Sequence, residues 1–252
     1  MIYNAPDLYD AQYAHYRDDL AFYTRLADDY GGSGIENQVL ELGAGTGRVT
    51  AALARAGHEV VAVDLSGAML ARAEMRLKEA GLLERVTLVQ ADMRTVKLDR
   101  NFPLVIAPFN TLMHLYTLAD QDAALAAVKR HLAPRGAFAL DLYNVFEPNL
   151  GATDVVRREP EWREVGGANA DLFLVQHHDR DEQVLESRYY LDTVGDDGGL
   201  TRQTAVLKQR YYTRFELERA LSQAGFTHLQ IYGSFDKRRY NHDAPHLVVV
   251  AR

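Results

Sequence analysis

Residues 39–50, with the sequence VLELGAGTGRVT, constrain the fold more than any other stretch of the chain. Val39–Leu42 is a short, mainly apolar run, which predicts a buried strand. The three glycines within Gly43–Gly47 predict a tight turn, because glycine tolerates positive φ and lets the backbone approach a ligand closely. Arg48–Ala56 continues with apolar residues at helical spacing, and such a helix would point its free N–H groups at the turn. Strand, turn and helix together predict a nucleotide-type binding site at the carboxyl edge of a sheet.

The spacing of these glycines indicates which ligand binds. A dinucleotide site has glycines at its first, third and sixth positions, but here the sixth position is Arg48. Glu41 lies two residues before the first glycine, where its carboxylate would repel a pyrophosphate and attract a ligand with an ammonium or sulfonium group. Glu41–Gly47 resembles motif I, E/D-x-G-x-G-x-G, of the class I S-adenosylmethionine-dependent methyltransferases. The alternative is a glycine-rich connection in another kind of α/β protein.

Two further acidic residues stand at the ends of the next two expected strands. Asp64 ends the apolar run Glu59–Asp64, and Asp92 follows the run Val86–Gln90. Because the carboxyl ends of parallel strands meet at one edge of a sheet, we expect Glu41, Asp64 and Asp92 to lie close together. The resemblance implies a cofactor site in which Glu41 lies near the methionine part of the cofactor, and Gly43, Ala44 and Gly45 cradle that part. Asp64 would bind the ribose, and Leu65 and Met69 would flank the adenine. Asp92 and the Met93 amide would contact the edge of the adenine, and Phe109 would also contact the cofactor.

Alternation of strands and helices up to about residue 149 predicts a parallel sheet with helices on both faces. Residues 150–212 instead show short alternating segments separated by turn signals, which predict an antiparallel β insertion. We therefore expect an α/β fold with a Rossmann-like seven-stranded methyltransferase sheet, whose last strand is antiparallel, and an antiparallel β insertion after strand five. The expected domains are a helical cap of residues 1–34, an S-adenosylmethionine-binding domain of residues 35–149 and 213–252, and the inserted subdomain.

The N-terminal segment is rich in tyrosine and shows apolar spacing typical of one or two helices over Leu8–Asp28. Its Tyr9-Asp10-x-x-Tyr13 pattern resembles the first helices of small-molecule methyltransferases, which cover cofactor and acceptor. An amphipathic cap that only packs on the sheet is the alternative. The resemblance also places Tyr13 and His114 near the acceptor. His114 is a candidate general base, and the alternative is a histidine that begins a helix and bonds to backbone.

Composition excludes several other classes of protein. The net charge of −7 and the isoelectric point near 5.7 argue against a nucleic-acid partner. The chain has no cysteine, so disulfides and thiolate metal sites are excluded. We expect no metal site, because the adjacent His177 and His178 would point to opposite faces of a strand. No apolar run reaches the length of a membrane span, and we expect a cytoplasmic protein without a membrane partner.

The segment after the fourth expected strand, Ala107–Asn110, departs from the N/D-P-P-Y/F motif of methyltransferases that act on base or amide nitrogens. The chain is most similar to small-molecule methyltransferases, especially those of amino sugars and glycine. This resemblance implies S-adenosylmethionine as cofactor and a small-molecule acceptor with an amine nitrogen. O- or C-methylation, a nicotinamide-dependent oxidoreductase and a non-catalytic cofactor-binding protein are the alternatives. The inserted sheet is expected to line the acceptor pocket or to form a homodimer interface.

Overall fold

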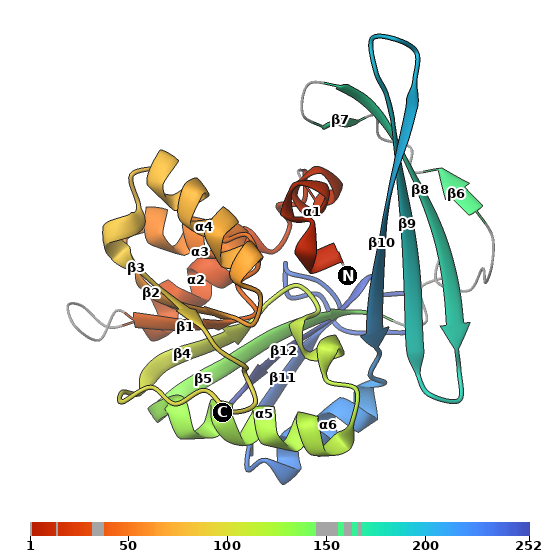
Figure 1. The fold of residues 1–252 in the computed structure, drawn as a ribbon. Helices are drawn as coiled ribbons and strands as arrows, with labels where there is room; N and C mark the ends of the chain where they lie inside the picture. The colour runs from red at the N-terminus through yellow and green to blue at the C-terminus, as the bar shows by residue number, and fades with distance from the viewer. Residues whose placement is uncertain (1, 14, 32–37, 145–155, 159–162, 166–167) are drawn as a thin grey trace.

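The computed structural model describes residues 2–13, 15–31, 38–144, 156–158, 163–165 and 168–252. Its larger sheet has seven strands in the order β11-β12-β5-β4-β1-β2-β3, as Figure 1 shows. All neighbouring pairs from β3 to β5 are parallel, and β12 runs antiparallel to both β5 and β11. The strands are β1 (Gln38–Leu42), β2 (Glu59–Asp64), β3 (Val86–Gln90), β4 (Phe102–Ala107), β5 (Leu132–Tyr143), β11 (Leu229–Tyr232) and β12 (His246–Ala251). The expected α/β fold is confirmed.

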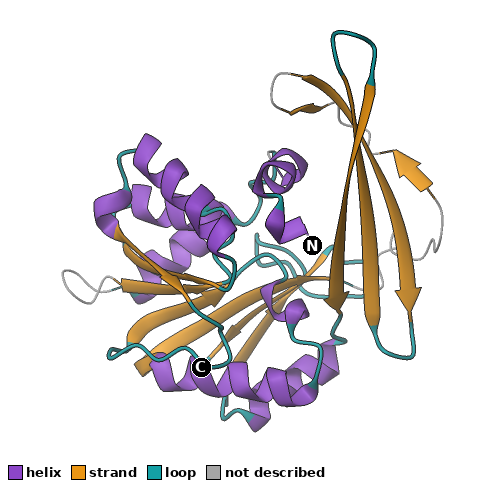
Figure 2. Ribbon diagram, in the orientation of Figure 1, coloured by secondary structure: helices purple, strands orange, loops and turns teal. Residues whose placement is uncertain are grey.

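Helices cover both faces of this sheet (Figure 2). One face packs against α2 (Leu20–Tyr30), α3 (Arg48–Arg55) and α4 (Gly67–Glu79), and the other against α5 (Leu118–His131) and α6 (Arg214–Gln223). The remaining helices are η1 (Ile2–Asn4), α1 (Pro6–Tyr13), η3 (Leu83–Arg85) and η4 (Thr111–His114). Hydroxyl side chains define two of the starts: Ser66 Oγ accepts from the N–H of Met69 in α4, and Thr213 and Glu216 form a capping box in α6.

Strand β5 differs from its expected length. The sequence predicts a strand that begins at Ala137, whereas β5 begins at Leu132. Arg135 has a φ of 66°, and the β4–β5 ladder shifts register between Phe102 and Leu104. A bulge of this kind lets a turn-like sequence remain within a strand, which explains why Pro134 did not end it.

The second sheet is the insertion after β5. Its strands are β6 (Val156–Arg158), β7 (Arg163–Val165), β8 (Ala168–Asp179), β9 (Val184–Val194) and β10 (Leu200–Arg210), in the order β10-β9-β8-β6, with β7 also paired to β8. All of these pairs are antiparallel, as expected. The predicted turn at residues 166–167 and the predicted domain border near 149 and 150 lie outside the described residues. The sheet stands beside the larger one, with η1 and α1 between them (Figure 1).

Candidate active site

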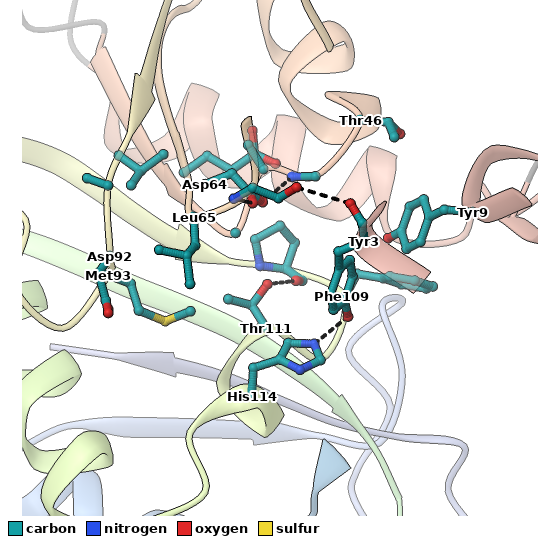
Figure 3. Close-up of a pocket in the computed structure, with 18 of the residues that line it drawn as sticks. Tyr3, Tyr9, Thr46, Asp64, Leu65, Asp92, Met93, Phe109, Thr111 and His114 are labelled. Atoms are coloured by element: carbon teal, nitrogen blue, oxygen red, sulfur yellow. Dashed lines mark hydrogen bonds between the residues drawn. The ribbon is translucent and has the colours of Figure 1, made fainter. Parts of the chain in front are cut away.

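A cavity of about 760 Å³ lies at the carboxyl edge of the seven-stranded sheet. Its volume falls in the range of small-molecule sites. Figure 3 shows side chains from the N-terminal segment, the glycine turn and the ends of β2, β3 and β4 around it. Ten of the predicted site residues line this cavity: Glu41, Gly43, Ala44, Gly45, Asp64, Leu65, Asp92, Met93, Phe109 and His114.

Two predicted site residues lie elsewhere. Met69 is not among the described residues that line the cavity, and its side chain is fully buried (0% exposed). The expectation that Met69 flanks the adenine is therefore not supported, and the exposed Leu65 is the side chain on that wall. Tyr13 lines an adjoining cavity of about 230 Å³, which shares Tyr3, Tyr9 and Phe109 with the first.

The glycine turn forms the floor of the larger cavity. Gly43 and Gly45 have φ values of 69° and 57°, a region that favours glycine. A Cβ on Gly43 would lie 2.5 Å from Thr111 Oγ1, so any side chain would collide with the wall of the cavity. The backbone here is shaped as a cradle, which fits a cofactor lying against the turn.

Glu41 is buried beneath this turn. Its register partners are Ala62 of β2 and Ile106 of β4, so the residue is flanked by a strand on each side, and only 1% of it is exposed. Burial raises the pKa of Glu41 to about 8, against the opposing hydrogen bond from Thr50 Oγ1 to Glu41 Oε2 at 2.6 Å. The carboxyl group is therefore mainly protonated at neutral pH, and a bound cation would favour its ionised form.

Asp64 joins the end of β2 to the glycine turn. Its Oδ2 accepts the N–H of Gly45 at 2.7 Å, and its Oδ1 accepts the N–H of Ser66 at 2.8 Å. Burial raises the pKa of Asp64, although these backbone hydrogen bonds act against the increase. A partly exposed carboxylate in this position can accept hydrogen bonds from ligand hydroxyl groups.

At the far end of the cavity, Asp92 is paired with a residue that sequence reasoning missed. Arg94 donates to both carboxylate oxygens of Asp92, and its Nη1 donates to Asp120 at 2.5 Å. The hydrogen bonds from Arg94 lower the pKa of Asp92. Arg94 follows the predicted acid by two residues, but its bridge to the start of α5 depends on tertiary packing.

The N-terminal segment roofs the cavity. Asp10 in α1 accepts from Thr46 Oγ1 at 2.6 Å and pairs with Arg72 and Arg76 of α4, both at 2.7 Å. In the same segment, the Tyr3 carbonyl accepts from Ser66 Oγ at 3.0 Å. Within this segment, η1 and α1 cover the cavity, whereas α2 buries its apolar face on the sheet.

His114 faces the cavity and contacts Tyr3 (Figure 3). Its Nε2 lies 2.6 Å from Tyr3 Oη, and burial lowers the pKa of the imidazole to about 4, against a hydrogen bond to the Lys208 backbone. A neutral ring that donates to the Lys208 carbonyl leaves Nε2 as the acceptor for the Tyr3 hydroxyl. His114 is thus neutral, weakly basic and already occupied by Tyr3.

A buried ion pair supports the aromatic wall between the two cavities. Arg48 bonds bidentately to Asp19, which is fully buried (0% exposed), with N–O distances of 2.5 and 2.6 Å. The guanidinium also lies over the rings of Tyr16 and Phe109, at 5.0 and 5.2 Å. Asp141 Oδ1 accepts the backbone N–H of Phe109 at 2.8 Å. Sequence reasoning used Arg48 only as a departure from a dinucleotide motif and missed this role.

Comparison with known proteins agrees with this geometry. Residues 39–136 match the family model described as a methyltransferase domain, and this range runs from β1 into β5. The dTDP-3-amino-3,6-dideoxy-alpha-D-glucopyranose N,N-dimethyltransferase of Streptomyces fradiae is 29% identical over 192 residues, which cover 75% of this chain and 69% of that protein. The chain therefore carries a methyltransferase domain. Its cofactor is S-adenosylmethionine, and the nicotinamide-dependent alternative is set aside.

Solved methyltransferases share the whole fold, including the insertion. The CcbJ methyltransferase from Streptomyces caelestis aligns with a TM-score of 0.79 at 23% identity, covering 96% of this chain and 95% of that one. CalS10, an amino pentose methyltransferase from Micromonospora echinaspora solved with S-adenosylmethionine bound, aligns with a TM-score of 0.73 at 24% identity, covering 97% and 96%. Among the described residues of our methyltransferase, no helix is long and apolar enough to cross a bilayer, and no cluster of three metal-ligating side chains occurs.

Proposed function

We propose that this methyltransferase transfers a methyl group to the amine nitrogen of a small molecule. The observation that carries the proposal is the pair of joined cavities, one against the glycine turn and one beside it, divided by Tyr3, Tyr9 and Phe109. A donor in the first and an acceptor in the second would meet at this aromatic wall. The faces of such rings attract cations, so they suit a nitrogen that becomes positively charged during methylation.

The residues of the larger cavity divide into regions that fit the parts of the cofactor. We infer that the turn Gly43–Gly45, together with Glu41, binds the methionine part. Asp64 would accept hydrogen bonds from the ribose hydroxyls, Leu65 would cover the adenine, and Asp92 with the Met93 amide would contact its edge. The bound cofactor supplies an activated methyl group on sulfur.

The chemistry left to the protein is alignment and exclusion of water. The acceptor nitrogen uses its lone pair to form the new C–N bond as the C–S bond breaks, and the resulting ammonium later loses a proton. Correct orientation of two reactants can supply roughly 7–11 kcal/mol of the barrier. The roof formed by η1 and α1 would exclude water and help to align the two reactants. Tyr3, which is hydrogen-bonded to His114, presents its phenol at the junction of the cavities.

Relatives support an amine acceptor. The Streptomyces fradiae protein is named for N,N-dimethylation of an amino sugar, and a glycine/sarcosine N-methyltransferase from Parasynechococcus marenigrum is 28% identical over 228 residues, covering 88% of this chain. Amines with sugar-like or amino-acid-like bodies are therefore the first acceptors to test. O- or C-methylation is the second candidate, and the same experiment separates it.

The experiment is a turnover screen for release of S-adenosylhomocysteine over amines, amino sugars, phenols and carboxylates. With a ¹³C-methyl donor, the chemical shift of the product distinguishes a methyl group on nitrogen from one on oxygen or carbon. We expect N-methyl products. Turnover confined to phenols or carboxylates would overturn the amine assignment. Tight binding of S-adenosylhomocysteine with no turnover of any acceptor would instead support a non-catalytic binding protein.

We also propose a cytoplasmic protein that acts on small molecules rather than nucleic acid, supported by its net charge of −7. For assembly we propose a homodimer through the inserted sheet. Strand β10 forms an edge of that sheet among the described strands, and its Leu200 is exposed, which suits pairing with a second copy. Light scattering that shows a monomer at all concentrations would remove the dimer.

A further inference from the structure

The buried part of the inner face of the inserted sheet is apolar except at one place. On this face β8 presents Ala170, Leu172 and Leu174, β9 presents Leu185, Tyr189 and Leu191, and β10 presents Ala205 and Leu207, all buried. Among the buried positions of this series, each of the three strands carries one polar residue: Gln176, Ser187 and Gln209. These three are also buried, with 7%, 2% and 7% exposed. Since the other buried positions of the series are apolar or tyrosine, the three form a distinct buried polar patch.

Strand register brings the three side chains together. Gln176 of β8 is directly opposite Ser187 of β9. On the other side of β9, Ser187 is opposite Leu207 of β10, and Gln209 follows Leu207 by two residues on the same face of the sheet. Their side chains line the 230 Å³ cavity, which also presents the phenols of Tyr13, Tyr143 and Tyr189. The polar patch therefore faces the space that the proposed function assigns to the acceptor.

Among the described residues, the contacts of Gln209 leave its amide N–H groups available to a ligand. Gln176 Nε2 donates to Ser187 Oγ at 3.2 Å, and Tyr143 Oη lies 3.3 Å from Gln209 Oε1. Gln209 Nε2 contacts only a weak acceptor, Met113 Sδ, at 3.9 Å. A buried amide donor is costly to leave poorly bonded, and leucine at this position would avoid that cost. The arrangement suits a ligand hydroxyl, which can accept from the amide and donate to a neighbouring oxygen.

We propose that Gln176, Ser187 and Gln209 form a subsite for the hydroxyl groups of the acceptor and fix which of its nitrogens faces the methyl group. This inference rests on the proposed function, because it assigns the smaller cavity to the acceptor. The proposed subsite would select amines that carry neighbouring hydroxyl groups over amines that have only a hydrocarbon body. The subsite belongs to the insertion, whereas the cofactor cavity is built from the N-terminal segment and β1–β4.

The test compares two acceptors that differ in hydroxyl groups, methyl 3-amino-3-deoxyglucopyranoside and cyclohexylamine, in the wild type and in Gln176→Leu, Ser187→Ala and Gln209→Leu. We expect the wild type to prefer the amino glycoside in kcat/KM. Each variant should lose about tenfold of that preference, through a higher KM for the glycoside and an unchanged KM for cyclohexylamine. Lys208→Leu is the matched control, because Lys208 is next to Gln209 but exposed on the opposite face.

Binding measurements keep the subsite and the proposed function separable. Calorimetry of the amino glycoside with S-adenosylhomocysteine present reports the subsite without turnover, and calorimetry of S-adenosylhomocysteine alone reports whether each variant is folded. Glycoside binding without methylation of any amine would overturn the proposed function but not the subsite. The subsite is overturned if the wild type does not bind the glycoside at millimolar concentration. It is also overturned if the variants lose both acceptors equally, which is the result a purely structural role would give.

Discussion

Replacing Glu41 by glutamine should stabilise the ligand-free protein while weakening cofactor binding. Glutamine has nearly the shape of the protonated carboxyl group and can still accept the hydrogen bond from Thr50 Oγ1, which is 2.6 Å from Glu41 Oε2. It cannot ionise. Because burial raises the pKa of Glu41 from 4.5 to about 8, the folded protein holds a proton that the unfolded chain releases over this range.

The size of the effect follows from this difference. A raised carboxyl pKa lowers the free energy of unfolding as the pH rises from the unfolded to the folded value, by about 1.4 kcal/mol per pH unit. At pH 7, which is 2.5 units above the ordinary pKa of 4.5, the raised pKa of Glu41 lowers the free energy of unfolding by about 3 kcal/mol. At pH 5 it lowers the free energy of unfolding by under about 1 kcal/mol. Glu41→Gln should recover most of this cost, so its advantage over the wild type should grow between pH 5 and pH 7.

Urea unfolding of both proteins at pH 5, 6, 7 and 8 measures the difference directly. Glu59→Gln is the matched control, since Glu59 begins the neighbouring strand β2 but is about half exposed. It should change the free energy of unfolding little at any pH. An advantage of Glu41→Gln that stays constant from pH 5 to pH 7, or a loss of stability at pH 7, would refute the reasoning. Calorimetry should show weaker S-adenosylmethionine binding in Glu41→Gln, because the charge that faces the ammonium and sulfonium groups is absent.

Three further outcomes follow from the site. Asp64→Ala should weaken S-adenosylhomocysteine binding by about 1.5–3 kcal/mol in calorimetry, through lost charge-assisted hydrogen bonds, whereas unchanged affinity would remove Asp64 from the site. Arg48→Met should lower the free energy of unfolding by about 3–5 kcal/mol, because it leaves Asp19 charged and buried, and denaturation curves like those of the wild type would contradict this. His114→Gln should lower kcat by a factor that is constant from pH 5.5 to pH 9, because a histidine pKa of about 4 leaves the ring neutral throughout; a factor that changes around pH 6.5 would restore the general base.

The sequence was most informative where local chemistry and strand order agree. The bounds of β2 and β3 follow their apolar runs. The acids at three strand ends lie around one cavity because parallel strands of this fold share a carboxyl edge. None of these inferences required knowledge of contacts between distant parts of the chain.

The features that the sequence did not predict all depend on such contacts. Met69 lies in the first turn of α4, and only the rotation of that helix against the sheet decides that its side chain is buried. The pairing of Arg48 with Asp19 joins α3 to a residue before α2, and the hydrogen bond between Tyr3 and His114 joins residues 111 positions apart in the sequence. Periodicity locates a helix but does not give its rotation or its partners.

The division of labour between the two sheets has a consequence for how enzymes with this fold can diversify. After β10 the chain returns to the larger sheet through α6 and β11, and β12 then pairs with β5, so the chain leaves for the insertion and returns from it at the same edge of that sheet. An exchange of this segment between related enzymes would alter what is methylated and leave the chemistry of donation intact. Natural change is then expected to accumulate in β8–β10 more freely than at Glu41 or Asp64. Chimaeras joined between β5 and β8 and between β10 and α6 offer a route to new acceptors without redesign of the donor site.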